Sequence, residues 1–78
     1  MSEADKMFEE LGFKKQSWLS ECENKIIYEN DKKSRFIVFT KTVKAVESET
    51  EHGFSNYIYP HEFPAINQKC KELGWLNE

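Results

Sequence analysis

The sequence contains few of the features that mark readily recognised classes of protein. Its 78 residues include only three glycines, two prolines and two cysteines. Because the glycines Gly12, Gly53 and Gly74 are isolated, they cannot form a glycine-rich phosphate loop. No long apolar run suggests a membrane span. A chain of this length supports one hydrophobic core, so residues 1–78 are expected to form a single domain, and a multidomain enzyme is excluded.

The charge balance also lacks a strong excess of either sign. Fourteen acidic residues against eleven basic ones give a formal net charge of −3, and the acids are interspersed with lysines. Proteins that bind duplex DNA use clustered Lys and Arg contacts to phosphate, so this balance argues against that class. The residues after Met1 lack the basic and apolar segments of a secretory signal, so we expect a cytoplasmic location.

Cysteine and histidine are too widely spaced to indicate a metal or nucleophilic site. The four candidates are Cys22, His52, His61 and Cys70. Structural zinc sites usually have ligands two to four residues apart, whereas no two of these lie closer than nine residues. In the cytoplasm both cysteines are expected to be thiols. We therefore expect no metal, no cofactor and no catalytic residues.

A first amphipathic helix is predicted to begin at about Glu3, with Ser2 as its N-cap. Its apolar residues follow the i, i+3, i+4, i+7 spacing that places them on one stripe: Ala4, Met7, Phe8 and Leu11. Gly12 can adopt the left-handed conformation that ends a helix, and Phe13 can then fold back onto the last turn, as in a Schellman motif.

A second helix is predicted to begin between His61 and Pro64, because proline is tolerated only in the first turn. Proline also disfavours helical angles in the residue before it, here Phe63. The residues expected to face the core are Phe63, Ile66, Cys70 and Leu73. The solvent side is expected to hold Asn67, Gln68, Lys69, Lys71 and Glu72. Gly74 and Trp75 repeat the ending of the first helix.

Between the helices, β-branched and aromatic residues indicate strands at residues 25–29 and 35–40, joined by a polar turn. The unbroken apolar run at residues 36–39 predicts a central strand that is buried on both faces.

The remaining strands are less regular. Residues 13–24 are expected to be an irregular strand and a loop. A weaker strand is predicted at residues 43–48, where either Val43 and Ala45 or Lys44 and Val46 point inward. A short last strand, which contains Phe54 and Tyr57, is predicted to follow and to end at Pro60. The predicted fold is α+β, with a three- to four-stranded antiparallel meander and an N-terminal and a C-terminal helix on one face, in the order α-β-β-β-(β)-α.

Three segments of the chain resemble known proteins. They are residues 4–13, 25–28 and 65–75, with the sequences ADKMFEELGF, KIIY and AINQKCKELGW. In these segments the chain resembles small uncharacterised proteins of phages and prophages in Gram-positive bacteria. The resemblance implies an accessory product made in the bacterial host cytoplasm, where such small proteins often bind a host or defence protein. It concerns helix faces, helix ends and one strand, which specify a fold rather than a chemistry.

We therefore expect a non-enzymatic protein that binds a host or defence-system protein. The predicted contact residues lie outside the two helical stripes, and they are Trp18, Phe54, Trp75 and Leu76. The alternative for the two tryptophans is that they close the ends of the core. Either a monomer or a homodimer fits the pattern, and no membrane partner is expected.

The alternative function is nucleic-acid binding through the sheet. Aromatic residues of the strands would stack on unpaired bases, and Lys32, Lys33 and Arg35 would contact phosphates. However, the same strands must also supply much of the core, and lysines along a strand edge also prevent aggregation. The net acidic charge further favours the protein partner.

Overall fold

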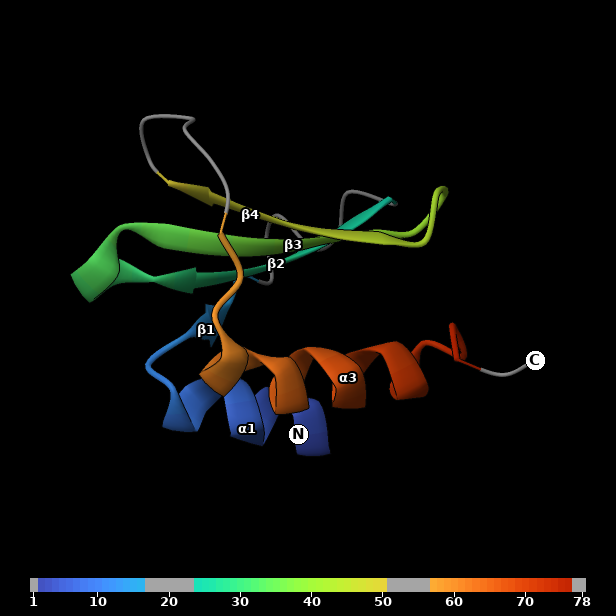
Figure 1. Cartoon of the computed structure of the whole chain (residues 1–78), viewed down its shortest axis with the longest axis horizontal. Coiled ribbons are helices and arrows are strands. Elements are labelled where there is room, and N and C mark those ends of the chain that lie inside the picture. The colour runs from blue at the N-terminus through green and yellow to red at the C-terminus, as the bar shows by residue number, and fades with distance from the viewer. Residues whose placement is uncertain (1, 17–23, 51–56, 77–78) are drawn as a thin grey trace.

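A computed structural model describes residues 2–16, 24–50 and 57–76, which form two layers (Figure 1). One layer is an antiparallel sheet with the order β1-β2-β3-β4. Its strands are β1 (Lys14–Lys15), β2 (Lys25–Asn30), β3 (Arg35–Thr40) and β4 (Ala45–Thr50). The other layer contains α1 (Glu3–Glu10) and α3 (Phe63–Glu72), which pack against each other on one face of the sheet. The predicted α+β meander is confirmed. No helix in these described ranges has the length and apolar character needed to span a bilayer.

The sequence predicted both ends of α1 correctly. Ser2 Oγ accepts a hydrogen bond from the Asp5 N–H at 3.0 Å, so Ser2 is the N-cap. At the other end Gly12 has a φ of 95°. The Phe13 N–H then donates to the Phe8 carbonyl at 2.9 Å, which is the long hydrogen bond of a Schellman motif. These short-range interactions end the helix and direct the chain toward β1.

The start of α3 departs from the prediction in one respect. A 3-10 turn, Pro60–Glu62, leads into the helix, and Phe63 has helical angles (φ −55°, ψ −44°) although Pro64 follows it. The expectation that Phe63 lies outside helical geometry was therefore wrong, because the preceding turn already sets the chain on a helical path. The other end matches the prediction, since Gly74 has a φ of 77° and the Trp75 N–H donates back to the last turn at 2.9 Å.

The fourth strand lies at the beginning of the chain and not near its end. β1 pairs with β2, and Lys14 lies opposite Glu29. Residues 57–59, predicted as part of a last strand, join no strand ladder, and Phe54 lies outside the described residues. Side chains bind the backbone of this segment instead. Arg35 donates to the Tyr57 carbonyl at 2.7 Å, and the Tyr59 N–H donates to a side-chain carboxylate at 3.1 Å.

The register of β4 resolves the alternative that the sequence left open. β4 begins at Ala45, while Val43 and Lys44 lie in the preceding turn, where Lys44 has a φ of 53°. Val46 and Ser48 face the helices, because they pair with the core residues Phe39 and Ile37 of β3. Val46 is therefore the inward residue, and Ala45 is exposed.

The core is built around three aromatic rings from three elements. Phe8 and Tyr28 lie with their ring centroids 4.0 Å apart, and the Phe39 ring meets them edge-on at 6.1 and 5.9 Å. The other buried members of this cluster are Phe13, Ile26, Ile37 and Ala65. β3 is buried on both faces as predicted, since Val38 on its outer face is only 3% exposed.

Candidate functional site

The apolar stripe of α3 is not the most deeply buried side of that helix. The side chains with the least exposure are Glu62 just before the helix, Ala65 and Lys69. The predicted core stripe comes one position later in each turn, and it comprises Phe63, Ile66, Cys70 and Leu73. Successive helical residues are separated by about 100° around the axis, so this stripe is turned away from the interior by roughly that angle.

This rotation leaves the stripe partly exposed. Ile66, Cys70 and Leu73 pack against the core only from the side, and Phe63 is 53% exposed. The sequence pattern placed all four on one stripe, and the predicted core included Ile66, Cys70 and Leu73. Those three residues are partly buried against the core, whereas Phe63 is exposed.

Lys69 occupies part of the buried side instead, although the sequence placed it on the solvent side. Its Nζ lies 6.0 Å from the centroid of the Tyr28 ring, and the side chain as a whole is buried. Lysine can bury its methylene groups while its ammonium reaches a polar region. Burial and repulsion from Lys15 lower the pKa of Lys69, and attraction to Asp5 and Glu72 opposes that shift.

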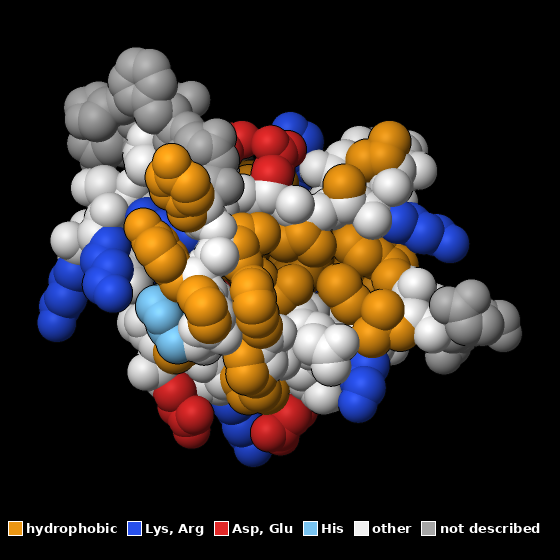
Figure 2. Space-filling view, in the orientation of Figure 1, with side chains coloured by type: hydrophobic (Ala, Val, Ile, Leu, Met, Phe, Trp, Pro, Cys, Tyr) orange, Lys and Arg blue, Asp and Glu red, His pale blue; other side chains and the backbone are white. Residues whose placement is uncertain are grey.

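Two further apolar side chains extend this surface. Val46 of β4 is partly buried against the core, and the Trp75 ring lies 6.0 Å from the Phe39 ring. Figure 2 shows hydrophobic side chains gathered in a band between the sheet layer and the helix layer. We define the open side as the surface formed by Val46, Phe63, Ile66, Cys70, Leu73 and Trp75.

Exposed aromatic residues adjoin the start of α3. Tyr57 is 76% exposed and Tyr59 is 45% exposed. The Tyr59 ring stacks on the His61 ring, with centroids 5.9 Å apart. In Figure 1 the connection that carries these residues descends from the sheet layer to α3. The sequence pattern predicted a strand here, whereas these residues lie in the connection to α3.

A buried ion pair fixes this connection to the sheet. Arg35 of β3 donates to Glu62 Oε2 and, at 2.8 Å, to Ser48 Oγ. Its Nη2 also donates to the Tyr57 carbonyl, and the other oxygen of Glu62 accepts from the Tyr59 N–H. The guanidinium carbon of Arg35 lies 5.0 Å from the centroid of the Tyr59 ring. The buried charges are thus well paired, and they determine where α3 begins.

The residues predicted to bind a protein are only partly within the described ranges. Trp18 and Phe54 lie outside them. Trp75 is partly buried on Phe39 and so closes one end of the core, which is the alternative considered for it. Leu76 is 45% exposed, and together with Trp75 it follows directly on the α3 stripe.

The residues predicted to bind nucleic acid do not form one surface. Lys32 and Lys33 are exposed in the 3-10 turn Asp31–Lys33. Arg35 is only 8% exposed, and its guanidinium is engaged by Glu62. The exposed cations of this set are therefore two lysines next to an aspartate.

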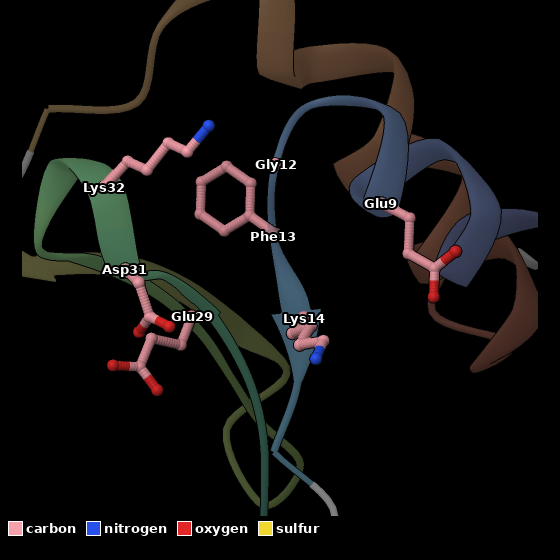
Figure 3. A pocket seen from close by; sticks show the side chains of 7 residues that line it. All are labelled: Glu9, Gly12, Phe13, Lys14, Glu29, Asp31 and Lys32. Carbon is pink, nitrogen blue, oxygen red and sulfur yellow. The ribbon is translucent and has the colours of Figure 1, made fainter.

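An open pocket of about 550 Å³ lies where α1 ends beside β1 and β2 (Figure 3). Its lining includes Phe13 and charged side chains of both signs. In Figure 3 Glu9 lies on the opposite side of the β1 ribbon from Asp31 and Glu29. The acidic groups therefore do not converge on one point.

Burial favours the neutral forms of two groups near the core, the Cys70 thiol and the Tyr28 hydroxyl. Burial raises the pKa of the Cys70 thiol, so this thiol is less ionised at neutral pH than an exposed cysteine. Burial and a 2.6 Å hydrogen bond to Asp5 raise the pKa of Tyr28. Within the described ranges no three His, Cys, Asp or Glu side chains are grouped so that they could hold a metal ion. The candidates Cys22 and His52 lie outside those ranges.

Comparisons of the chain with models of protein families, with curated proteins and with solved structures find no match. The geometry of the open side is therefore the main basis for a functional proposal. The described residues form a small two-layer α+β domain with a partly uncovered apolar surface.

Proposed function

We propose that this protein is not an enzyme and that it acts by binding another protein through the open side. The observation that carries the proposal is the rotation of α3, which leaves the stripe from Phe63 to Leu73 partly exposed. Apolar surface in contact with water is unfavourable, and contiguous apolar patches on small soluble domains commonly mark interaction sites.

The residue types of this region also suit a protein interface. Aromatic side chains are frequent binding anchors; here Phe63 belongs to the open side, and the exposed Tyr57 and Tyr59 lie in the connection just before α3. The resemblance to phage and prophage proteins suggests the partner class. On this proposal the protein is an accessory product of a phage or prophage that binds a host or defence-system protein in the bacterial cytoplasm.

The proposal is tested by capturing partners from a lysate of a Gram-positive bacterium at moderate salt. The wild-type protein and a Phe63→Ser/Leu76→Ser variant serve as baits, because both side chains are about half exposed and neither belongs to the core cluster or to the residues packed against it. We expect one protein to be retained by the wild type. The captured protein should bind the variant roughly thirtyfold more weakly than it binds the wild type, which corresponds to about 2 kcal/mol.

Val43→Ser is the matched control, since Val43 is an apolar residue that is 68% exposed in the β3–β4 turn. This variant should retain the partner, and circular dichroism should confirm that all three proteins fold. Equal retention by the double variant would contradict the proposal. Recovery of salt-released nucleic acid that depends on Lys32 and Lys33 would favour nucleic-acid binding instead.

A further inference from the structure

β4 is an edge strand of the described sheet and contributes Val46 to the open side. In the described ranges β4 pairs only with β3, so it lies at the edge of the sheet. An edge strand presents backbone N–H and C=O groups that can pair with another extended chain. Because Val46 belongs both to β4 and to the open side, a chain that pairs with β4 would also reach the apolar stripe of α3.

The other face of β4 carries negative charge. Glu47 and Glu49 alternate with the inward residues, and they lie opposite Val38 and Phe36 of β3. Among the described residues neither glutamate forms an ion pair. A strand beside β4 would therefore meet carboxylates on one face and apolar side chains on the other.

This charge pattern disfavours a second copy of the protein as the occupant. Two β4 strands can pair with each other around a two-fold axis so that the same face of each strand points inward. Two registers of this kind pair five of the six residues of each strand. One sets Glu47 opposite Glu47 of the second copy, and the other sets Glu47 opposite Glu49 of the second copy. Like charges directly opposite each other destabilise a strand pair.

We propose that the open side binds an extended segment of the partner, which adds to the sheet as a strand beside β4. Its alternate side chains are basic and apolar. The basic ones lie opposite Glu47 and Glu49, and the apolar ones pack against Val46 and the α3 stripe. The inference rests on the proposed function and specifies the chemistry of the partner. In this mode of recognition backbone hydrogen bonds supply affinity, and alternate side chains supply specificity.

The first test uses the full chain and synthetic peptides. The probe is an acetylated and amidated eight-residue peptide in which lysine alternates with valine. One control replaces each lysine with glutamate, and a second carries N-methyl groups on alternate backbone amides. We expect saturable binding of the lysine peptide and slower amide exchange in β4. Both controls should bind at least tenfold more weakly. Absence of saturable binding, or of protection in β4, would overturn the inference.

The second test reverses the charge on β4. A Glu47→Lys/Glu49→Lys variant should lose the lysine peptide and bind the glutamate peptide. The matched control, Glu9→Lys/Glu10→Lys, makes the same charge change on exposed positions of α1 and should keep the wild-type preference. Equal affinity of wild type and the β4 variant for the lysine peptide would overturn the inference. A dimer in which β4 is protected without peptide would also overturn it, because the occupant would then be a second copy.

The two proposals can fail separately. If the captured partner is lost with Phe63→Ser/Leu76→Ser but kept with Glu47→Lys/Glu49→Lys, strand addition is wrong and protein binding by the open side stands. If the partner is kept by both variants, both proposals are wrong. Loss with both variants, together with the peptide result, supports strand addition.

Discussion

At the scale of single residues, Gly12 illustrates how a helix end is coupled to the sheet. A Cβ at this position would lie 3.1 Å from Asn30 Nδ2. The Asn30 side chain is buried, donates to the Leu11 carbonyl at 3.3 Å and accepts from the Lys33 N–H at 3.3 Å. One amide thus connects the end of α1 with the turn after β2, and a Cβ at Gly12 would force this amide to shift.

Substitution of Gly12 should therefore be more harmful than substitution of the corresponding glycine of α3. Both Gly12 and Gly74 have positive φ and are exposed, but a Cβ at Gly12 would also press on the Asn30 side chain. We expect Gly12→Ala to lower the free energy of unfolding by about 1–3 kcal/mol, and Gly74→Ala to lower it by less. Urea denaturation of both variants measures the difference. Equal losses would indicate that the backbone angle alone matters and that contact with Asn30 does not.

The Arg35–Glu62 pair gives a second prediction at this scale. Replacing Arg35 with methionine leaves the Glu62 carboxylate buried without its counter-ion. Such an uncompensated buried charge typically costs 3–5 kcal/mol, roughly half the stability of a small domain. The Arg35→Met/Glu62→Gln double variant should lose less than the sum of the two single losses. A double-mutant cycle by urea denaturation measures this coupling, and additive losses would show that the two side chains act independently.

At the scale of elements, α1 illustrates why short helices depend on their neighbours. Its eight residues are too few for a stable isolated helix. Glu72 near the end of α3 accepts a hydrogen bond from the Ala4 N–H at 3.0 Å, and the Tyr28 hydroxyl of β2 donates to Asp5 at 2.6 Å. The first turn of α1 is therefore held by both the second helix and the sheet.

Elements whose formation depends on local interactions could be predicted from the sequence. The N-cap Ser2 and the glycines that end both helices act within a few residues, and the β-branched and aromatic residues of β2 and β3 favour strands wherever they occur. By contrast, the absence of a strand at residues 57–59 depends on Arg35, which lies 22 residues from Tyr57 in the sequence. No local pattern indicates such a contact.

The candidate site was less predictable for a related reason. Periodicity identifies which residues of α3 share a stripe, but it does not determine how the helix is rotated against its neighbours. The observed rotation places Ala65 and Lys69 on the buried side of the helix. A lysine among polar residues gives no sign in the sequence that it will be buried. The open side could therefore be identified only from the way in which the helices pack on the sheet. Of the four residues predicted to bind a protein, only Trp75 and Leu76 lie within the described ranges.

At the scale of the whole molecule, one side of the two-layer arrangement is less completely covered. The ring cluster of Phe8, Tyr28 and Phe39 is well enclosed between α1, β2 and β3. The apolar residues of β4 and α3 at the margin of that core are only partly covered. A domain this small buries a modest fraction of its surface, so a partner on the open side would also enlarge the core.

Two carboxylates that hold the first turn of α1, those of Asp5 and Glu72, predict how the stability of the fold depends on pH. Burial acts to raise the pKa of Asp5, but the hydrogen bond from Tyr28 and attraction to Lys15 and Lys69 outweigh it, so the pKa lies below its ordinary value of 3.8. Glu72 is shifted in the same direction, chiefly by the Ala4 N–H acting against burial. Carboxylates with lowered pKa values stabilise the folded state above their unfolded pKa. This stabilisation is lost as the pH falls through the lower folded value.

Asp5→Asn tests this account. At pH 7 the variant should be less stable than the wild type by about 1 kcal/mol, because its hydrogen bond to Tyr28 is no longer charge-assisted and solvent screening limits the effect at a half-buried site. The difference should shrink as the pH falls below 3.8 and through the lowered pKa of the wild-type carboxyl, because that carboxyl then becomes protonated as well. Urea denaturation between pH 7 and 2 measures both curves, with Glu10→Gln on the exposed side of α1 as the control that keeps the wild-type pH dependence. A constant difference across this range would show that the charge on Asp5 does not contribute to holding α1 on the sheet.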